Sequence, residues 1–107
     1  MTDINNPKDE LTNAGLRVVA FSGNARSNFL EALDLAKDGK FEEADQYIKM
    51  GLENLELAGQ AQKDFFTNEA EGNREGLDFL AIHAQDHYIT TLLLRDLINN
   101  LIDIYKK

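Results

Sequence analysis

Apolar residues recur every three or four positions along three stretches of the sequence, as they do on one face of an α-helix. The stretches cover residues 9–37, 41–68 and 76–105, and a loosely attached or disordered segment is expected over residues 1–8. The second stretch has the most regular seam, with alternating steps of three and four: Phe41, Ala44, Ile48, Gly51, Leu55, Ala58, Gln62 and Phe65. Such a seam is typical of helices that cross at a shallow angle, and we predict an all-α, antiparallel, up-down-up three-helix bundle.

Residues with known preferences for helix ends lie at or within two positions of these boundaries. Pro7 suits the first position of a helix, and Gly39 is predicted to cap the first helix in the left-handed conformation. Glu42 and Glu43 suit the positive N-terminal end of the second helix. The polar segment 68–76 contains two glycines and is predicted to be the longest linker.

Small residues interrupt the apolar pattern of the first helix. Gly15 and Gly23 each cost about 1 kcal/mol relative to alanine in a helix, so a reason for them is expected. We interpret these glycines and Ser22 as places where another helix approaches closely, with a direct ligand contact as the alternative. Asn24 and Arg26 are candidate contacts to a partner or to phosphate. The apolar face of this helix contains Leu11, Ala14, Val18, Ala25, Phe29, Ala32, Leu33 and Ala36.

The third stretch is apolar nearly all round, which predicts a helix that is buried on more than one side. Two partner helices cover only part of such a surface, so we predict an oligomer with this helix at the subunit interface. One stripe contains Leu77, Leu80, Ala84, His87, Thr91, Leu94, Ile98, Leu101 and Tyr105. The stripe expected to face other subunits contains Phe79, His83, Asp86, Thr90, Leu93, Leu97 and Ile104. A third face carries Ile82, Ile89 and Leu92.

Length and composition restrict the class of protein. A chain of 107 residues is expected to form one domain, and without cysteine it has neither disulfides nor thiolate metal sites. The net charge of −8 argues against nucleic-acid binding, which needs clustered basic residues. The chain lacks the patterns of a signal peptide and of a membrane span, so we expect a cytoplasmic protein.

Both histidines of the chain lie close together in the third stretch, with an aspartate between them. On a helix, Asp86 projects about 60° to one side of His83 and His87 about 40° to the other. This arrangement allows three roles: metal binding, phosphoryl relay through a nucleophilic imidazole, or packing of two histidines without chemistry. The absence of a third histidine and of cysteine argues against a zinc hydrolase.

The segment Ile82-His83-Ala84-Gln85-Asp86-His87 resembles enzyme IIA of the lactose/cellobiose class of the bacterial sugar phosphotransferase system (PTS). The ending Asp103-Ile104-Tyr105-Lys106-Lys107, the segment Ser22-Gly23-Asn24-Ala25-Arg26-Ser27 and the segment Gly39-Lys40-Phe41-Glu42-Glu43-Ala44 are also similar to that family. The resemblance extends from about residue 10 to the end of the chain. Tyr88-Ile89 departs from it, because the family more often has Leu-Met there.

The resemblance implies a homotrimer of three-helix bundles that carries phosphate on His83. The phosphate would come from the histidine-containing phosphocarrier protein, HPr, and pass to the IIB component during uptake of a lactose-, cellobiose- or chitobiose-type sugar. The resemblance places His87 near His83 in an assisting role, and Gln85 of the same segment is a further candidate catalytic residue. It also implies that Asp86 meets its symmetry mates around a divalent ion, Mg²⁺. His83 is then expected at the rim of the interface, where two proteins can reach it.

One alternative has a different class of function. In this alternative the chain is a non-catalytic, oligomeric helical interaction module, and both histidines serve only in packing.

Overall fold

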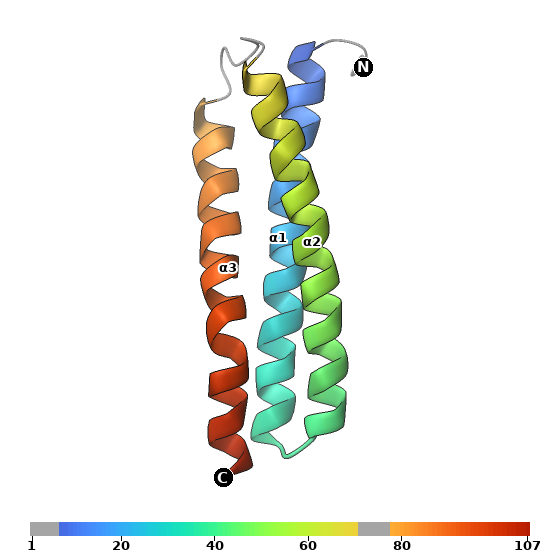
Figure 1. The fold of residues 1–107 in the computed structure, drawn as a ribbon, viewed down its shortest axis with the longest axis vertical. Coiled ribbons are helices and arrows are strands. Elements are labelled where there is room, and N and C mark those ends of the chain that lie inside the picture. Colours follow the sequence, from blue (N-terminus) through green and yellow to red (C-terminus); the bar gives the residue numbers. More distant parts are fainter. Residues whose placement is uncertain (1–6, 71–77) are drawn as a thin grey trace.

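The computed structural model describes residues 7–70 and 78–107. This part of the chain forms three helices and contains no strand (Figure 1). They are α1 (Pro7–Lys37), α2 (Phe41–Ala70) and α3 (Asp78–Lys106). Figure 1 shows that α1 and α3 run in the same direction and that α2 runs in the opposite direction. The predicted all-α, up-down-up arrangement is therefore confirmed for one chain.

The helix boundaries agree with the predicted ones to within two residues wherever the described residues allow the comparison, and those at Lys37 and Phe41 coincide. Helix α1 begins at Pro7, so the predicted disorder is wrong for residues 7 and 8. Proline at the first helical position explains the earlier start, since its fixed φ suits a helix and its missing N–H is not needed there. Helix α2 continues to Ala70, two residues beyond the predicted end. Residues 1–6 and 71–77, which include most of the predicted linker and the first two positions of the predicted third helix, lie outside the described residues.

The turn between α1 and α2 is closed by Gly39. Its φ of 79° is left-handed, as predicted. The N–H of Gly39 donates to the carbonyl of Ala36 at 3.0 Å, and that of Lys40 donates to the carbonyl of Leu35 at 2.9 Å. These two bonds form a Schellman motif, which satisfies the last carbonyls of α1. Helix α2 begins directly afterwards and returns alongside α1.

The core lies mainly around α1, which packs against both other helices, whereas α2 and α3 meet at only a few positions. The predicted faces of α1 and α2 are buried, apart from half-buried Leu33 and Phe41. On α3, Ala84, Thr91 and Ile98 are buried as the first stripe predicts. Ile102 is also buried, although no predicted stripe includes it.

Two glycines lie where helices approach closely. A Cβ added at Gly51 would lie 2.5 Å from Cε1 of the buried Phe29 ring. One added at Gly15 would lie 2.9 Å from Cδ2 of Leu80 and 3.1 Å from the ring of Phe65. Close approach is therefore confirmed for Gly15. It is wrong for Gly23, where an added Cβ would meet nothing within 4 Å.

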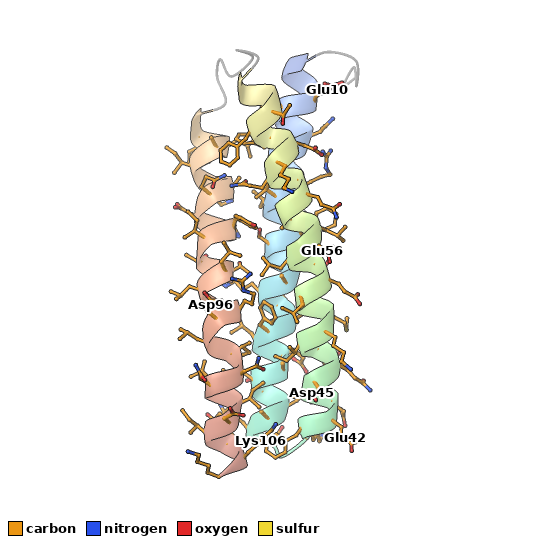
Figure 2. The ribbon with its side chains drawn as sticks, in the orientation of Figure 1. Glu10, Glu42, Asp45, Glu56, Asp96 and Lys106 are labelled. Carbon is orange, nitrogen blue, oxygen red and sulfur yellow. The ribbon has the colours of Figure 1, made fainter. Side chains whose placement is uncertain are left out.

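Acidic side chains are spread along the bundle and do not form one patch. Glu10, Glu42, Asp45, Glu56 and Asp96 are exposed on three different helices (Figure 2). This distribution fits a solvated surface better than a single acidic binding site. Within the described ranges, none of the helices has an apolar stretch sufficient to cross a membrane.

Candidate functional site

His83 lies on α3 between two aromatic rings, each one helical turn away. The ring of Phe79 is stacked on it, with centroids 6.0 Å apart and an interplanar angle of 8°. The ring of His87 meets it edge-on, with centroids 4.5 Å apart and an angle of 75°. His83 itself is exposed. The imidazole is therefore restricted in orientation by its neighbours while remaining open to solvent in the single chain.

His87 is more enclosed and lies toward α1. Its Nδ1 is buried and has no hydrogen-bond partner among the described residues. Thr91 anchors the adjacent backbone, because its hydroxyl donates to the carbonyl of His87 at 2.6 Å and lies 3.4 Å from the carbonyl of Ser22 on α1. A buried ring nitrogen without a partner is costly, so it is available for a hydrogen bond with a bound group.

A pocket of about 220 Å³ joins the two histidines to α1. His83, Asp86, His87 and Thr90 line it from α3, and Arg26 lines it from α1. Of these residues, only Arg26 comes from outside α3, and it supplies a positive charge. The pocket lining therefore combines two imidazoles, a carboxylate and an arginine.

Asp86 lies at the centre of an uncovered apolar stripe. Leu93 and Leu97 project within about 20° of its direction on α3, and Ile104 projects in the same direction. These three side chains are 58%, 44% and 65% exposed in the single chain. His83 projects about 60° to the side of Asp86. The histidine is thus placed at the edge of the stripe and the carboxylate in its middle.

Gln85 lies apart from the histidine pocket. Its side chain projects about 160° away from that of His83 and reaches α2. Its amide forms two reciprocal hydrogen bonds with Gln62, at 2.6 and 2.8 Å. Gln62 is the polar member of the α2 seam and is 8% exposed. Within one chain, this contact indicates that Gln85 positions α3 against α2, where few other contacts hold the two helices together.

This pair gives a testable stability prediction. Gln62→Leu should lower the free energy of unfolding by about 1 kcal/mol or more, because Gln85 loses both partners and only part of its amide can reach water. The double variant Gln62→Leu/Gln85→Leu should recover much of that loss. Urea denaturation at a fixed chain concentration measures both values. Strictly additive losses would contradict the coupling.

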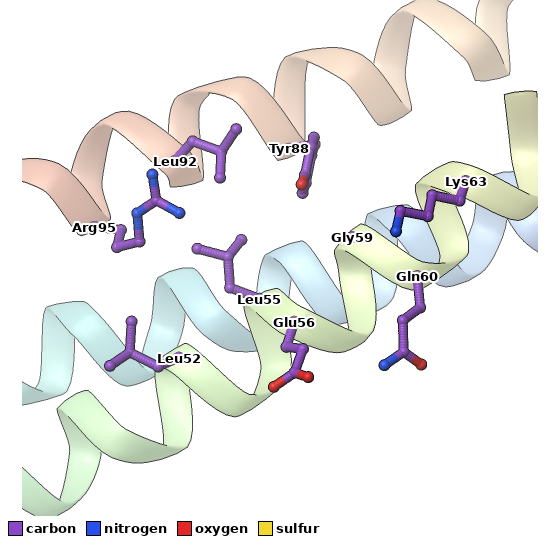
Figure 3. A pocket seen from close by; sticks show the side chains of 9 residues that line it. All are labelled: Leu52, Leu55, Glu56, Gly59, Gln60, Lys63, Tyr88, Leu92 and Arg95. Carbon is purple, nitrogen blue, oxygen red and sulfur yellow. The ribbon is translucent and has the colours of Figure 1, made fainter.

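A second pocket, of about 450 Å³, lies between α2 and α3 (Figure 3). Tyr88, Leu92 and Arg95 line it from α3, facing leucines and charged residues of α2. The hydroxyl of Tyr88 lies over Gly59, where an added Cβ would be 3.3 Å from it. Charges of both signs and apolar groups alternate around this pocket, so its lining does not indicate one class of ligand.

Within its described residues, one chain alone forms no metal cluster. Over residues 7–70 and 78–107, the structure contains no group of three or more His, Asp or Glu side chains that could hold an ion. A carboxylate is a suitable ligand for Mg²⁺, but each chain offers only Asp86 on the uncovered stripe. These residues therefore fit a metal only if several copies of the chain bring their Asp86 side chains together.

The structure brings together three of the four predicted site residues: His83, Asp86 and His87. It adds Arg26 and Thr90 to the pocket and Phe79 to the surroundings of His83. The positions of Thr90 and Phe79 follow from the helical spacing, since they lie four residues from Asp86 and His83. Arg26 was a candidate in the sequence, but only the packing of α1 against α3 places it beside the histidines.

The chain is similar to known proteins over most of its length. Residues 13–106 match the family model described as "PTS system, Lactose/Cellobiose specific IIA subunit". The chain is 43% identical over 100 residues to the PTS system lactose-specific EIIA component of Staphylococcus epidermidis, covering 94% of this chain and 96% of that one. It is 37% identical to the component of the same name from Streptococcus mutans, covering 94% and 96%.

A solved structure has the same fold. The crystal structure of the PTS cellobiose-specific enzyme IIA from Bacillus anthracis matches with a TM-score of 0.80 and 35% identity, covering 90% of this chain and 88% of that one. The match to the family model and the identity to its members both extend over nearly the whole chain. The chain therefore belongs to the lactose/cellobiose-specific IIA family of the PTS, whose members are phosphoryl carriers in sugar uptake.

Proposed function

We propose that this protein accepts a phosphoryl group on His83 from HPr and passes it to the IIB component of a sugar permease. The observation that carries this proposal is the exposed imidazole of His83, held between the rings of Phe79 and His87 at the mouth of a charged pocket. A neutral imidazole nitrogen is a nucleophile that can accept a phosphoryl group and release it again. Phosphoryl transfer to and from an imidazole changes no oxidation state, so it needs no redox cofactor.

The transfer is a simple exchange of phosphorus–nitrogen bonds. An imidazole nitrogen of His83 attacks the phosphorus of phosphorylated HPr, and the bond between that phosphorus and the HPr histidine breaks. The bonding electron pair returns to the HPr ring. In the second half of the cycle, a nucleophile of IIB attacks the same phosphorus and His83 leaves. The protein contributes orientation and charge stabilisation, which are the main needs of phosphoryl transfer.

His87 assists His83 in this proposal. Its ring stands edge-on to that of His83, and its buried Nδ1 has no partner among the described residues. Such a nitrogen, when protonated, can donate a hydrogen bond to a phosphoryl oxygen. Gln85 holds α3 in register through Gln62 and so acts as a positioning residue.

The active assembly in this proposal is a homotrimer. The uncovered stripe of α3 (Phe79, Leu93, Leu97 and Ile104 around Asp86) is too apolar to remain in water, and three copies of one helix can bury it around a three-fold axis. The three Asp86 carboxylates would then converge and repel one another. Mg²⁺ bound between them would supply the charge that stabilises the assembly. No step of the phosphoryl exchange passes through this ion.

The proposed partners are proteins and the proposed location is the cytoplasm. HPr and IIB would dock in turn on the face that exposes His83. The sugar is of the lactose, cellobiose or chitobiose type, in keeping with the lactose-specific and cellobiose-specific names of the similar proteins.

Reconstitution of the pathway tests the function. Incubation with phosphoenolpyruvate, enzyme I and HPr should add one phosphate per chain, measured by intact mass spectrometry, and later addition of IIB should remove it. The uncovered α3 stripe would also suit a non-catalytic oligomeric interaction module. That alternative is supported, and phosphoryl carriage is overturned, if the folded chain takes up no phosphate while a known IIA protein in the same mixture does.

A further inference from the structure

Arg26 differs from the other arginines in the described part of the chain. Arg17 forms an ion pair with Asp64 at 3.4 Å, and Arg95 forms one with Asp96 at 3.0 Å. Arg26 is exposed and has no hydrogen-bond or ion-pair partner among residues 7–70 and 78–107. Arg26 nevertheless lines the pocket that contains His83 and His87. A positive charge without a partner is thus placed beside the proposed phosphoryl carrier.

The positive charge of Arg26 would offset negative charge that phosphorylation brings into the pocket. A phosphoryl group on His83 would bring negative charge close to Asp86, in a chain that already has a net charge of −8. At short range the two negative groups repel, and a Mg²⁺ shared by three Asp86 carboxylates would still leave one of their negative charges uncompensated, so a further cation beside His83 favours phosphoryl uptake. Arg26 is the cationic side chain in the lining of this pocket. Its planar guanidinium matches two oxygens of one phosphoryl group, which a lysine ammonium cannot do.

We infer that Arg26 binds the phosphoryl group carried by His83 and stabilises it during transfer. This inference rests on the proposed function and assigns α1 a direct part in the site, whose other residues all come from α3. The guanidinium donates two hydrogen bonds to phosphoryl oxygens, and these bonds strengthen as charge accumulates on the oxygens in the transition state. Arg26 then acts on the rate of transfer and does not serve mainly to dock a partner protein.

Single-turnover phosphoryl uptake from phosphorylated HPr tests this inference. With saturating HPr, Arg26→Gln should lower the uptake rate by about ten- to a hundredfold, the effect of losing charge-assisted hydrogen bonds. Arg26→Lys keeps the charge but loses the two-pronged geometry, so its rate should fall between those of Arg26→Gln and the unmodified protein. Arg17→Gln is the matched control, because it removes an exposed arginine of the same helix outside the pocket.

The outcomes separate this inference from the proposed function. An unchanged saturating rate in Arg26→Gln, with the unmodified protein still phosphorylated, overturns the role of Arg26 and leaves carriage by His83 intact. A change only in the HPr concentration at half-maximal rate also overturns it, since that result indicates docking. Circular dichroism checks that the variants fold. If Arg26→Gln does not fold, a saturating rate of Arg26→Lys equal to that of the unmodified protein is the overturning result.

Discussion

His83→Ala should abolish phosphoryl uptake completely, while His87→Ala should still reach one phosphate per chain at a lower rate. The reason is the different environment of the two rings. His83 is exposed and held between Phe79 and His87, whereas His87 is half-buried and turned toward α1. The nucleophile must reach a phosphorus atom on another protein, and only an accessible imidazole can do so. Intact mass spectrometry after incubation with phosphoenolpyruvate, enzyme I and HPr measures the uptake.

The two variants act as controls for each other, because they remove the only two histidines of the chain one at a time. Neither substitution creates a large cavity in the core, so both proteins should keep the helical circular-dichroism spectrum of the unmodified chain. Full phosphorylation of His83→Ala would end the assignment to His83. If His87→Ala alone lost phosphorylation, the carrier would be His87 and the exposed ring would have the assisting role.

Much of the fold follows from periodicity alone. The seam of α2 is buried from Ala44 to Phe65 because steps of three and four keep its side chains on one face, and this face packs on α1. The polar member of the seam, Gln62, could be recognised but not explained, since its partner Gln85 lies on another helix. Helical spacing gives the direction of a side chain and does not tell which helix it meets.

Because helical spacing does not identify the neighbouring helix, close approach was wrongly predicted at Gly23 and the burial of Ile102 was missed. Gly15 and Gly23 look alike in the sequence, but only Gly15 lies beneath other side chains, those of Leu80 and Phe65. Ile102 was missed because α3 is apolar nearly all round, so its pattern does not distinguish the side facing α1 from the uncovered side. Arg26 could be placed beside His83 only after the relative positions of α1 and α3 along the bundle were known.

Some features of the site follow from one helix alone, and others depend on how α1 packs against α3. His83, Asp86 and His87 share one region because they are close in sequence on one helix, and no tertiary contact is needed to place them together. The restriction of the His83 ring by Phe79 is also local. In contrast, the pocket exists because α1 closes one side of it with Arg26. The uncovered stripe cannot be understood from one chain alone, since in the proposed trimer its neighbours are in other copies.

Leu97→Glu should dissociate the proposed trimer into monomers. Leu97 is 44% exposed in the single chain and projects within about 20° of Asp86, so in the trimer its substitution would bury a second ring of carboxylates. An unpaired carboxylate in an apolar interface costs at least about 2 kcal/mol per chain. Leu57→Glu is the matched control, because Leu57 is 40% exposed but lies on α2, away from the stripe. Sedimentation equilibrium measures the mass of each assembly.

Asp86→Leu should have the opposite effect, because it removes charge from the centre of the same stripe. The variant should remain a trimer, and its thermal stability should not fall on addition of a chelator, whereas the unmodified trimer should lose stability when Mg²⁺ is removed. Together the two substitutions separate the apolar and ionic parts of the interface. A trimer of unchanged stability in Leu97→Glu would show that the stripe is not the interface. A well-folded monomer in Asp86→Leu would show that Asp86 holds the subunits together by contacts other than a shared ion.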